Sequence, residues 1–415
     1  MEIPRQTSVV VVGAGLSGLS CARLLQSQGI DLVVVDSSDA VGGRMRSDQV
    51  QGFILDRGFQ VLLTAYEELN RQADLTALDL KPFTPGSLIW TGQRLERLGD
   101  PFRDPTTLLK SMFSSVGTIE DKLRVALLRQ RLLRRSAEMA FVGPEQSTED
   151  ELRQEGFSDA FIDQFFRPFL GGVFLERGLE TSANLFRYYF RCFAAGDAAV
   201  PALGIQRLPE QMAEPLGTRI HLKTTVKGIT DGAVTLDDGS KIIADHIVLA
   251  TDGAAAATLS NIQAPKSKAS ITSYFSAAEA PINEPLLILD GEGTGPANHV
   301  AMMSKVSSTY ASEGRHLIAV SGVDEAAAGD STSFHQAART QLTRWFGSSV
   351  SAWEHLKTYR IPAALPQHPP GFERARPPQR NSDGIWITGD YSDFGSTQGA
   401  LRSGRATAES VLAAK

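Results

Sequence analysis

The sequence is poor in the residues that metal and disulfide chemistry require. It has two cysteines, Cys21 and Cys192, with no C-x-x-C pair and no metal-ligand spacing to any of the seven histidines. Both cysteines lie in apolar segments that we expect to be helical, where a thiol usually acts as a small buried side chain. We therefore predict no metal site, no redox cysteine pair and a reducing, cytoplasmic setting.

The sequence also lacks long runs of like charge and long runs of apolar residues. The formal net charge is -6, and no long basic run marks a nucleic-acid partner. No stretch reaches the ~18 uninterrupted apolar residues that would indicate a membrane-spanning helix. The 415-residue length favours two domains. Together these features favour an enzyme or binding protein for a small molecule.

The N-terminal segment carries a nucleotide-binding pattern. A run of β-branched residues at 9–12 predicts a strand buried on both faces of a parallel sheet. It leads into Gly13-Ala14-Gly15-Leu16-Ser17-Gly18, which fits G-x-G-x-x-G. The first glycine permits the tight turn, the second lets a pyrophosphate approach the backbone, and the third lets helix and strand pack closely.

The pattern continues as a complete βαβ unit. We expect a helix over 19–28, ended by Gly29, and a second buried strand over 32–35. Asp36 follows that strand, where its carboxylate can accept hydrogen bonds from a ribose, and Ser37 beside it is included among the predicted cofactor contacts. This unit alone does not separate NAD from FAD, since both present the same pyrophosphate and ribose.

The residues that follow resemble a known family. Val41-Gly42-Gly43-Arg44-Met45-Arg46, followed by Gly52 to Gly58, resembles the extended flavin fingerprint of the amine oxidase and phytoene desaturase superfamily. The resemblance implies that the cofactor is FAD. It implies that Gly42, Gly43 and Arg44 wrap the pyrophosphate and ribityl chain, and that Gly58, Phe59 and Gln60 lie near the isoalloxazine ring.

Two positions stand outside that resemblance. Arg46 has no assigned partner, and a solvent-facing role is at least as good an interpretation as a ligand contact. The family more often has Glu at the position of Asp36, so the shorter side chain is expected to contact the ribose through water.

The middle of the chain predicts a β-meander. Strands are expected over 225–229, 233–236, 241–243 and 247–250, with a turn at 237–239. The resemblance implies that this stretch returns to the flavin domain. Val226 would then touch the adenine through its backbone, and Ala250 with Thr251 would end a strand beside the cofactor.

The C-terminal segment resembles the terminal flavin motif of the same superfamily. A buried strand at 385–388 precedes Gly389-Asp390-Tyr391, then Gly395-Ser396-Thr397-Gln398-Gly399-Ala400, and a helix is expected from about Leu401. The resemblance implies that Gly389 and Asp390 face the ribityl chain and phosphate. The amides of Gln398, Gly399 and Ala400 would face the pyrimidine edge of the ring, where a helix N-terminus stabilises negative charge on reduced flavin.

These patterns predict an α/β fold of two domains. A Rossmann-like FAD-binding domain, with a parallel sheet, helices and a β-meander, is expected from residues 1–75, 200–265 and 360–415. An α+β substrate domain is expected from 76–199, mostly helical, and 266–359. The aromatic residues between 161 and 193 suggest either an apolar tunnel or plain core packing, and core packing is the favoured interpretation.

Two basic features have competing interpretations. The stretch 122–139 is basic and amphipathic, which suits either a helix lying on a membrane surface or a solvated helix. The solvated helix is favoured because the apolar face lacks Trp or Phe anchors, and peripheral membrane contact stays open. Lys268 stands where some amine oxidases use a lysine, but a surface lysine is favoured.

The expected function is oxidoreduction by FAD. A hydride passes from a substrate C–H bond to flavin N5, desaturase-like, leaving C=C in a small or apolar organic substrate. The stretch 168–174 resembles carotenoid desaturases more than amine oxidases. An amine oxidase, which leaves C=N and releases peroxide, is the alternative, and a non-catalytic flavin-binding protein is another. Oxygen or a quinone is the expected electron acceptor, and no catalytic side chain is assigned.

Overall fold

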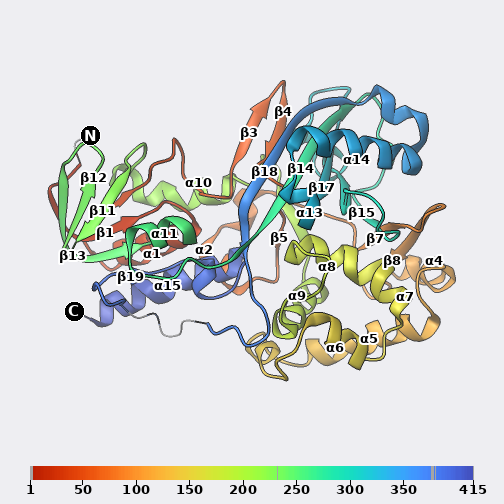
Figure 1. Cartoon of the computed structure of the whole chain (residues 1–415), viewed down its shortest axis with the longest axis horizontal. Helices are drawn as coiled ribbons and strands as arrows, with labels where there is room; N and C mark the ends of the chain where they lie inside the picture. The colour runs from red at the N-terminus through yellow and green to blue at the C-terminus, as the bar shows by residue number, and fades with distance from the viewer. Residues whose placement is uncertain (1–2, 231, 375–377, 379, 415) are drawn as a thin grey trace.

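The polypeptide is organised around two large β-sheets with helices packed against them (Figure 1). The computed structural model describes residues 3–230, 232–374, 378 and 380–414. The expected domain ranges also include residues outside this description, namely 1, 2, 231, 375–377, 379 and 415.

The first sheet carries the nucleotide-binding pattern. Its strand order is β10-β2-β1-β13-β12-β11, with β19 pairing with β13. The pairs joining β10, β2, β1, β13 and β19 are parallel, whereas β11, β12 and β13 form an antiparallel meander. The predicted Rossmann-like α/β class with a β-meander is therefore confirmed. The strands are β1 (Gln6–Val12), β2 (Leu32–Val35), β10 (Ile220–His221), β11 (Val226–Thr230), β12 (Ala233–Leu236), β13 (Lys241–Leu249) and β19 (Trp386–Ile387).

The meander differs from the prediction at one point. Two strands were expected at 241–243 and 247–250, but β13 is continuous. Its first half pairs with β12 and alternates between exposed and buried residues, whereas its second half is buried beside β1. The hydrophobic pattern of the sequence therefore changes along β13, whereas the strand itself is continuous.

Two helices bring the ends of the chain together against this sheet. Helix α1 (Leu16–Ser27) packs on α15 (Thr397–Ala413), where a Cβ on Gly404 would lie 2.1 Å from the carbonyl oxygen of Ser17. The hydroxyl of Ser20 donates to the carbonyl of Leu401 at 2.7 Å. Both helices begin earlier than predicted, because the caps are Gly15 and Ser396.

The second sheet has the order β18-β14-β17-β16-β15-β7-β8, and every pair in it except β15–β7 is antiparallel. Residues 80–99, expected to be mostly helical, form β6, β7 and β8, because distant strands supply pairing partners, β9 for β6 and β15 for β7. Residues 360–366 also pair here, although 360 was the expected start of the third segment of the flavin domain. The strands are β18 (Glu354–Pro366), β14 (Ser267–Ala277), β17 (His316–Gly322), β16 (His299–Met302), β15 (Leu287–Asp290), β7 (Gly86–Trp90) and β8 (Leu95–Gly99).

Helices cover both sheets and form a separate layer at the end of the second one (Figure 1). That layer contains α4 (Leu108–Phe113), α5 (Ile119–Leu133), α6 (Thr148–Gln154), α7 (Asp159–Phe161), α8 (Arg167–Phe174) and α9 (Ala183–Ala195). The remaining helices are α2 (Glu67–Gln72), α3 (Leu75–Leu78), α10 (Arg207–Ala213), α11 (Gly253–Leu259), α12 (Met303–Val306), α13 (Asp324–Ala328) and α14 (Ser331–Phe346). Smaller strands are β3 (Ser47–Val50), β4 (Phe53–Asp56), β5 (Leu62–Leu63), β6 (Leu80–Pro82) and β9 (Ala198–Pro201).

Membrane and metal features were searched over the described part of the chain. No helix there is both long and apolar enough to span a bilayer. Within the same residues, no three His, Cys, Asp or Glu side chains gather to hold a metal ion.

Candidate active site

A cavity of about 1200 Å³ runs from the glycine-rich turn of the first sheet to the helical layer. Its volume exceeds the ~300–1,000 Å³ of an ordinary ligand pocket, so it has room for a cofactor and a substrate. Most of the predicted cofactor residues line one end, which we call the nucleotide end. They are Gly13, Gly15, Leu16, Ser17, Asp36, Ser37, Gly42, Gly43, Arg44, Gly58, Phe59, Gln60, Ala250, Thr251, Gly389, Asp390 and Ala400.

The three fingerprint glycines have separate roles. Gly13 has φ +113, and a Cβ there would lie 2.6 Å from the carbonyl oxygen of Ala250. A Cβ on Gly18 would lie 2.0 Å from the carbonyl oxygen of Gly13, so this glycine lets α1 pack against the turn. A Cβ on Gly15 would meet no heavy atom within 4 Å. Gly15 therefore keeps space open on the cavity side rather than inside the protein.

That space fits a pyrophosphate. Gly15 is the N-cap of α1 and provides no side-chain cap, so the first amides of the helix have no capping oxygen. Uncapped amides at a helix N-terminus attract phosphate through their N–H groups and the helix dipole. The residues present therefore suit the phosphates of a dinucleotide cofactor.

The Asp36 carboxylate accepts hydrogen bonds from the backbone around the turn, and it also lines the cavity. One carboxylate oxygen accepts the N–H of Ala14 at 2.6 Å, and the other accepts the N–H of Ser38 at 2.7 Å. Each oxygen retains a second lone pair, so the same carboxylate can still accept from a ribose hydroxyl.

Arg44 connects the N-terminal and C-terminal motifs. Its guanidinium lies 2.6 Å from the carboxylate of Asp390 and donates to the carbonyl of Ala364 at 2.7 Å. The amide of Gln60 donates to the carbonyl of Arg44 at 3.0 Å. Three predicted cofactor residues thus hold one another in place at the cavity wall.

Four predicted cofactor residues do not line the cavity. Gly18 lies in the contact between α1 and the turn, and Val226 pairs with Leu236 in the meander. The side-chain amide oxygen (Oε1) of Gln398 accepts the backbone N–H of Glu68 at 2.8 Å in a buried position.

Gly399 is the fourth of these residues. Its N–H donates to the Ser396 hydroxyl at 2.8 Å, and a Cβ there would lie 1.9 Å from the carbonyl oxygen of Phe394. Because α15 begins at Thr397, the Gly399 amide belongs to the capped first turn of the helix. It is therefore committed to the helix cap instead of facing the cavity.

Two basic residues lie elsewhere than expected. Arg46 is buried, not solvent-facing, and its guanidinium pairs with Asp39 at 2.9 Å. The Lys268 side chain is largely covered, with 11% of it exposed, and its Nζ lies 2.6 Å from Glu176 and 2.8 Å from the Thr181 hydroxyl. Burial lowers the pKa of Lys268, and the charge of Glu176 opposes this shift. Lys268 is not among the cavity-lining residues.

The aromatic stretch supplies the other end of the cavity, which we call the aromatic end. Phe161, Phe165 and Phe169 recur every four residues and line it, whereas Phe166 and Phe186 are packed in the core. Both interpretations of the stretch therefore apply, to different side chains. Other residues that line this end are Phe83, Gly172, Val173, Leu175, Tyr189, Phe190, Phe193 and Leu287.

His299 is a cavity residue that the sequence did not point to. Its Nδ1 accepts from the side-chain amide of Asn298 at 3.2 Å, and that amide also donates to the carbonyl of Pro168 at 2.8 Å. With the Asn298 amide in this orientation the ring proton is assigned to Nε2, which is enclosed by protein and has no hydrogen-bond partner among the described residues. The ring packs edge-on to Phe59 at 4.8 Å, and burial lowers its pKa to about 4.

The fold and the cavity are those of a dinucleotide-binding protein, with the second sheet and the helical layer beyond the nucleotide end. The family of flavin-containing amine oxidoreductases matches residues 16–412. The chain therefore belongs to this family, and FAD is its cofactor.

Individual relatives agree with that family. Protoporphyrinogen oxidase 2 of Arabidopsis thaliana is 31% identical over 165 residues, which are 40% of this chain and 32% of the relative, so the match spans about a third of that protein. The 15-cis-phytoene desaturase of Solanum lycopersicum is 23% identical over 99% of this chain and 79% of its own length. A triple mutant of putrescine oxidase superimposes with a TM-score of 0.75 at 19% identity, covering 99% of both chains.

Proposed function

We propose that this protein is an FAD-dependent oxidoreductase that dehydrogenates an apolar organic substrate, converting C–C to C=C in the manner of a desaturase. The observation that carries this proposal is the aromatic end of the cavity. Phenylalanine rings from α7, α8 and α9 form its walls. Such walls bind apolar surface and exclude water, which a hydride transfer requires.

The chain's own residues supply binding and orientation. When bound, FAD supplies the hydride acceptor. The ring of Phe59, a residue of the nucleotide end, packs against His299 of the aromatic end, and its N–H donates to the Thr272 hydroxyl at 3.2 Å, which fixes the backbone beside Gly58. The substrate is thereby held between aromatic walls and the nucleotide end.

His299 gives the aromatic end a polar contact. Its imidazole is neutral at neutral pH because burial depresses the pKa to about 4. Its Nε2 is enclosed by protein atoms, so a substrate acceptor would reach the Nε2–H after a shift of the neighbouring side chains, and the bond would add no charge. A buried donor without a partner is costly, and a bound substrate that accepts from it removes that cost.

An amine oxidase is the second candidate, and the family name supports it. The charges at the cavity oppose an ammonium substrate, because Lys122 and Arg129 line the aromatic end with Asp100 beside them, while Arg103 is paired with Asp197. Like charges repel a cationic substrate, so a neutral or anionic apolar molecule fits better. Oxygen or a quinone is the proposed electron acceptor for either reaction.

The test is anaerobic bleaching of the bound flavin's absorbance. Apolar polyenes or isoprenoids, dispersed in detergent, should bleach the band, and simple primary and secondary amines should not. Peroxide release on adding amines in air would establish the amine oxidase instead. A purified protein that takes up FAD but is bleached by neither class would contradict both reactions and leave a flavin-binding role without turnover.

A further inference from the structure

An exposed apolar patch lies on α4, α5 and the segment before them. We define the apolar patch as Phe102, Leu108, Met112, Phe113, Ile119, Leu123 and Leu127, all exposed large apolar side chains. Among the described residues, nine of the eleven exposed large apolar side chains lie between 102 and 142. Single exposed apolar residues are ordinary, but a concentration of this kind marks an interaction surface.

Helix α5 has apolar residues on two faces. Leu128 and Leu132 are buried toward the core. Ile119, Leu123 and Leu127, spaced four apart, lie on the opposite side, and Leu127 is 65% exposed. A helix that only covers the core would present polar side chains there, so this second face is unexplained by folding.

The segments of the patch are tied together. The Nζ of Lys122 on α5 donates to the carbonyls of Met112 and Ser114 at 3.3 Å and 2.8 Å, at the end of α4. The guanidinium of Arg129 stacks over the Phe102 ring at 4.6 Å. Phe113, which is 84% exposed, projects from this assembly. Phe102 and Phe113 are the aromatic anchors that the helix sequence alone lacks.

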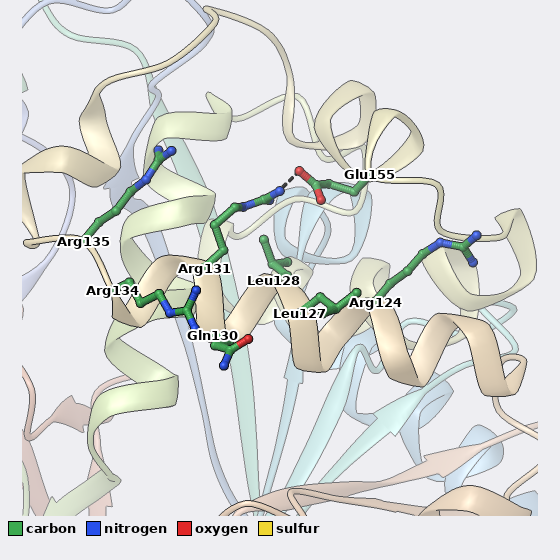
Figure 2. A pocket seen from close by; sticks show the side chains of 8 residues that line it. All are labelled: Arg124, Leu127, Leu128, Gln130, Arg131, Arg134, Arg135 and Glu155. Atoms are coloured by element: carbon green, nitrogen blue, oxygen red, sulfur yellow. Dashed lines mark hydrogen bonds and ion pairs between the residues drawn. The ribbon is translucent and has the colours of Figure 1, made fainter.

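Positive charge flanks the patch. Residues 119–135 contain six basic and two acidic side chains, a net charge of +4 in a chain whose net charge is -6. Figure 2 shows Arg124, Arg131 and Arg135 directed to one side of α5, with Leu127 between the first two. These residues line an open cavity of about 640 Å³, in which Arg131 pairs with Glu155. The partner that suits both features is a surface with apolar and anionic components.

The patch also forms the entrance to the active-site cavity. Phe102, Leu108 and Met112, together with Ile119 and Leu123, are exposed and line the cavity as well. The cavity therefore opens within the apolar patch.

We propose that the apolar patch docks on the surface of an anionic lipid bilayer, with Phe113 and Leu127 inserted among the lipids and the arginines of α5 contacting phosphate headgroups. Docking replaces the water over the patch by lipid, which removes the cost of exposing it. Resting on the proposed function, the cavity then receives its apolar substrate directly from the bilayer. The sequence favoured a solvated helix because the phenylalanines that complete the surface lie outside that helix.

The test is flotation of the FAD-loaded protein with vesicles. One set contains phosphatidylcholine with an equal amount of phosphatidylglycerol, and the other phosphatidylcholine alone. The wild type should float with the anionic vesicles, and added salt should weaken binding. Phe113→Asp with Leu127→Asp should reduce binding roughly tenfold or more, because apolar burial is lost. Neither residue lines the active-site cavity.

The matched control is Leu203→Asp, since Leu203 is 56% exposed and lies outside the patch. It should bind like the wild type. Arg134→Glu with Arg135→Glu should weaken binding without touching the apolar residues. Flavin absorbance and the thermal midpoint establish that each variant is folded.

Several outcomes would overturn the proposal. The wild type stays unbound to anionic vesicles at low salt, or Leu203→Asp loses as much binding as the patch variant. A third is a dimer by light scattering that the patch variant dissociates, which would show a second copy covering the surface. Bleaching by detergent-dispersed substrate does not need vesicles, so failure of the reaction and failure of docking are distinguishable.

Discussion

The two ends of the active-site cavity are built in opposite ways. At the nucleotide end the walls are backbone, and glycines set how closely strands, turns and helices approach. At the aromatic end the walls are side chains from α4, α5, α7, α8 and α9. The first end repeats one geometry that a dinucleotide requires, whereas the second is shaped by whichever side chains fill it.

This difference implies different responses to substitution. A methyl group added at Gly13 or Gly18 meets backbone that cannot move aside, so its cost to stability is high and local, whereas one added at Gly15 enters the space for the cofactor. A change at the aromatic end alters contacts with the substrate while the fold remains. Four substitutions test this contrast, the largest expected effect first.

Gly18→Ala should destabilise the protein by about 3 kcal/mol or more, because its Cβ would lie 2.0 Å from the carbonyl oxygen of Gly13. The variant should also lose bound FAD. Denaturant unfolding and flavin absorbance measure both effects. Gly228→Ala is the control, since a Cβ there meets nothing within 4 Å. A Gly18→Ala protein with wild-type stability and bound FAD would contradict the expected difference between the two ends of the cavity.

His368→Gln should change how stability depends on pH. The Nε2 of His368 accepts the N–H of Gly395 at 2.8 Å in the C-terminal flavin motif. Burial, aided by the charge of Lys268, lowers its pKa from 6.5 to about 4, while Asp390 and Asp393 oppose the shift. Between these values the unfolded chain binds more protons than the folded one, so stability falls as the pH decreases.

The expected loss from His368 is about 3 kcal/mol on going from pH 7 to pH 4. Gln keeps an acceptor for Gly395 but does not titrate, so the variant should lose less stability over that interval. Burial raises the pKa of Asp56 to about 6, which acts in the opposite direction, but equally in both proteins. Urea unfolding at a series of pH values measures the difference. If the unfolding free energies of the two proteins depended on pH in parallel, His368 would not be the titrating group.

Gly15→Ala separates cofactor binding from folding. Its Cβ meets no protein atom within 4 Å but enters the cavity at the start of α1. The apoprotein should unfold within about 1 kcal/mol of the wild type. FAD affinity should fall roughly tenfold to a hundredfold, since the backbone can no longer approach the pyrophosphate closely. Titration calorimetry on the apoprotein measures the affinity, and an equal loss of stability would show that Gly15 is a packing glycine instead.

The sequence predicted the nucleotide end well because that end depends on neighbouring residues. Strand β2 occupies the predicted residues, and α1 begins three residues before the predicted Leu19. The turn at 237–239 is confirmed, with Gly239 at φ +85. Local turn chemistry and β-branched runs fix these elements before any distant contact forms.

The remaining features depend on partners far along the chain. Strand β7 pairs with β15, about two hundred residues away, and Lys268 is largely covered where Glu176 pairs with it. His299 lies in a short buried strand whose sequence resembles any other core strand. The spacing of Phe161, Phe165 and Phe169 could have indicated one lined helix face, but periodicity does not reveal whether a core or a cavity lies opposite.

His299→Phe tests the aromatic end and should have the smallest effect. Phenylalanine keeps the edge contact with Phe59 but removes the Nε2 donor, so FAD affinity and stability should change little. For a substrate that carries a hydrogen-bond acceptor, kcat/KM should fall roughly threefold to tenfold, the value of one neutral hydrogen bond. An analogue without the acceptor should react equally with both proteins, because it never used the donor. If both substrates lose the same factor, His299 only shapes the cavity, and the aromatic end is wholly apolar in its recognition.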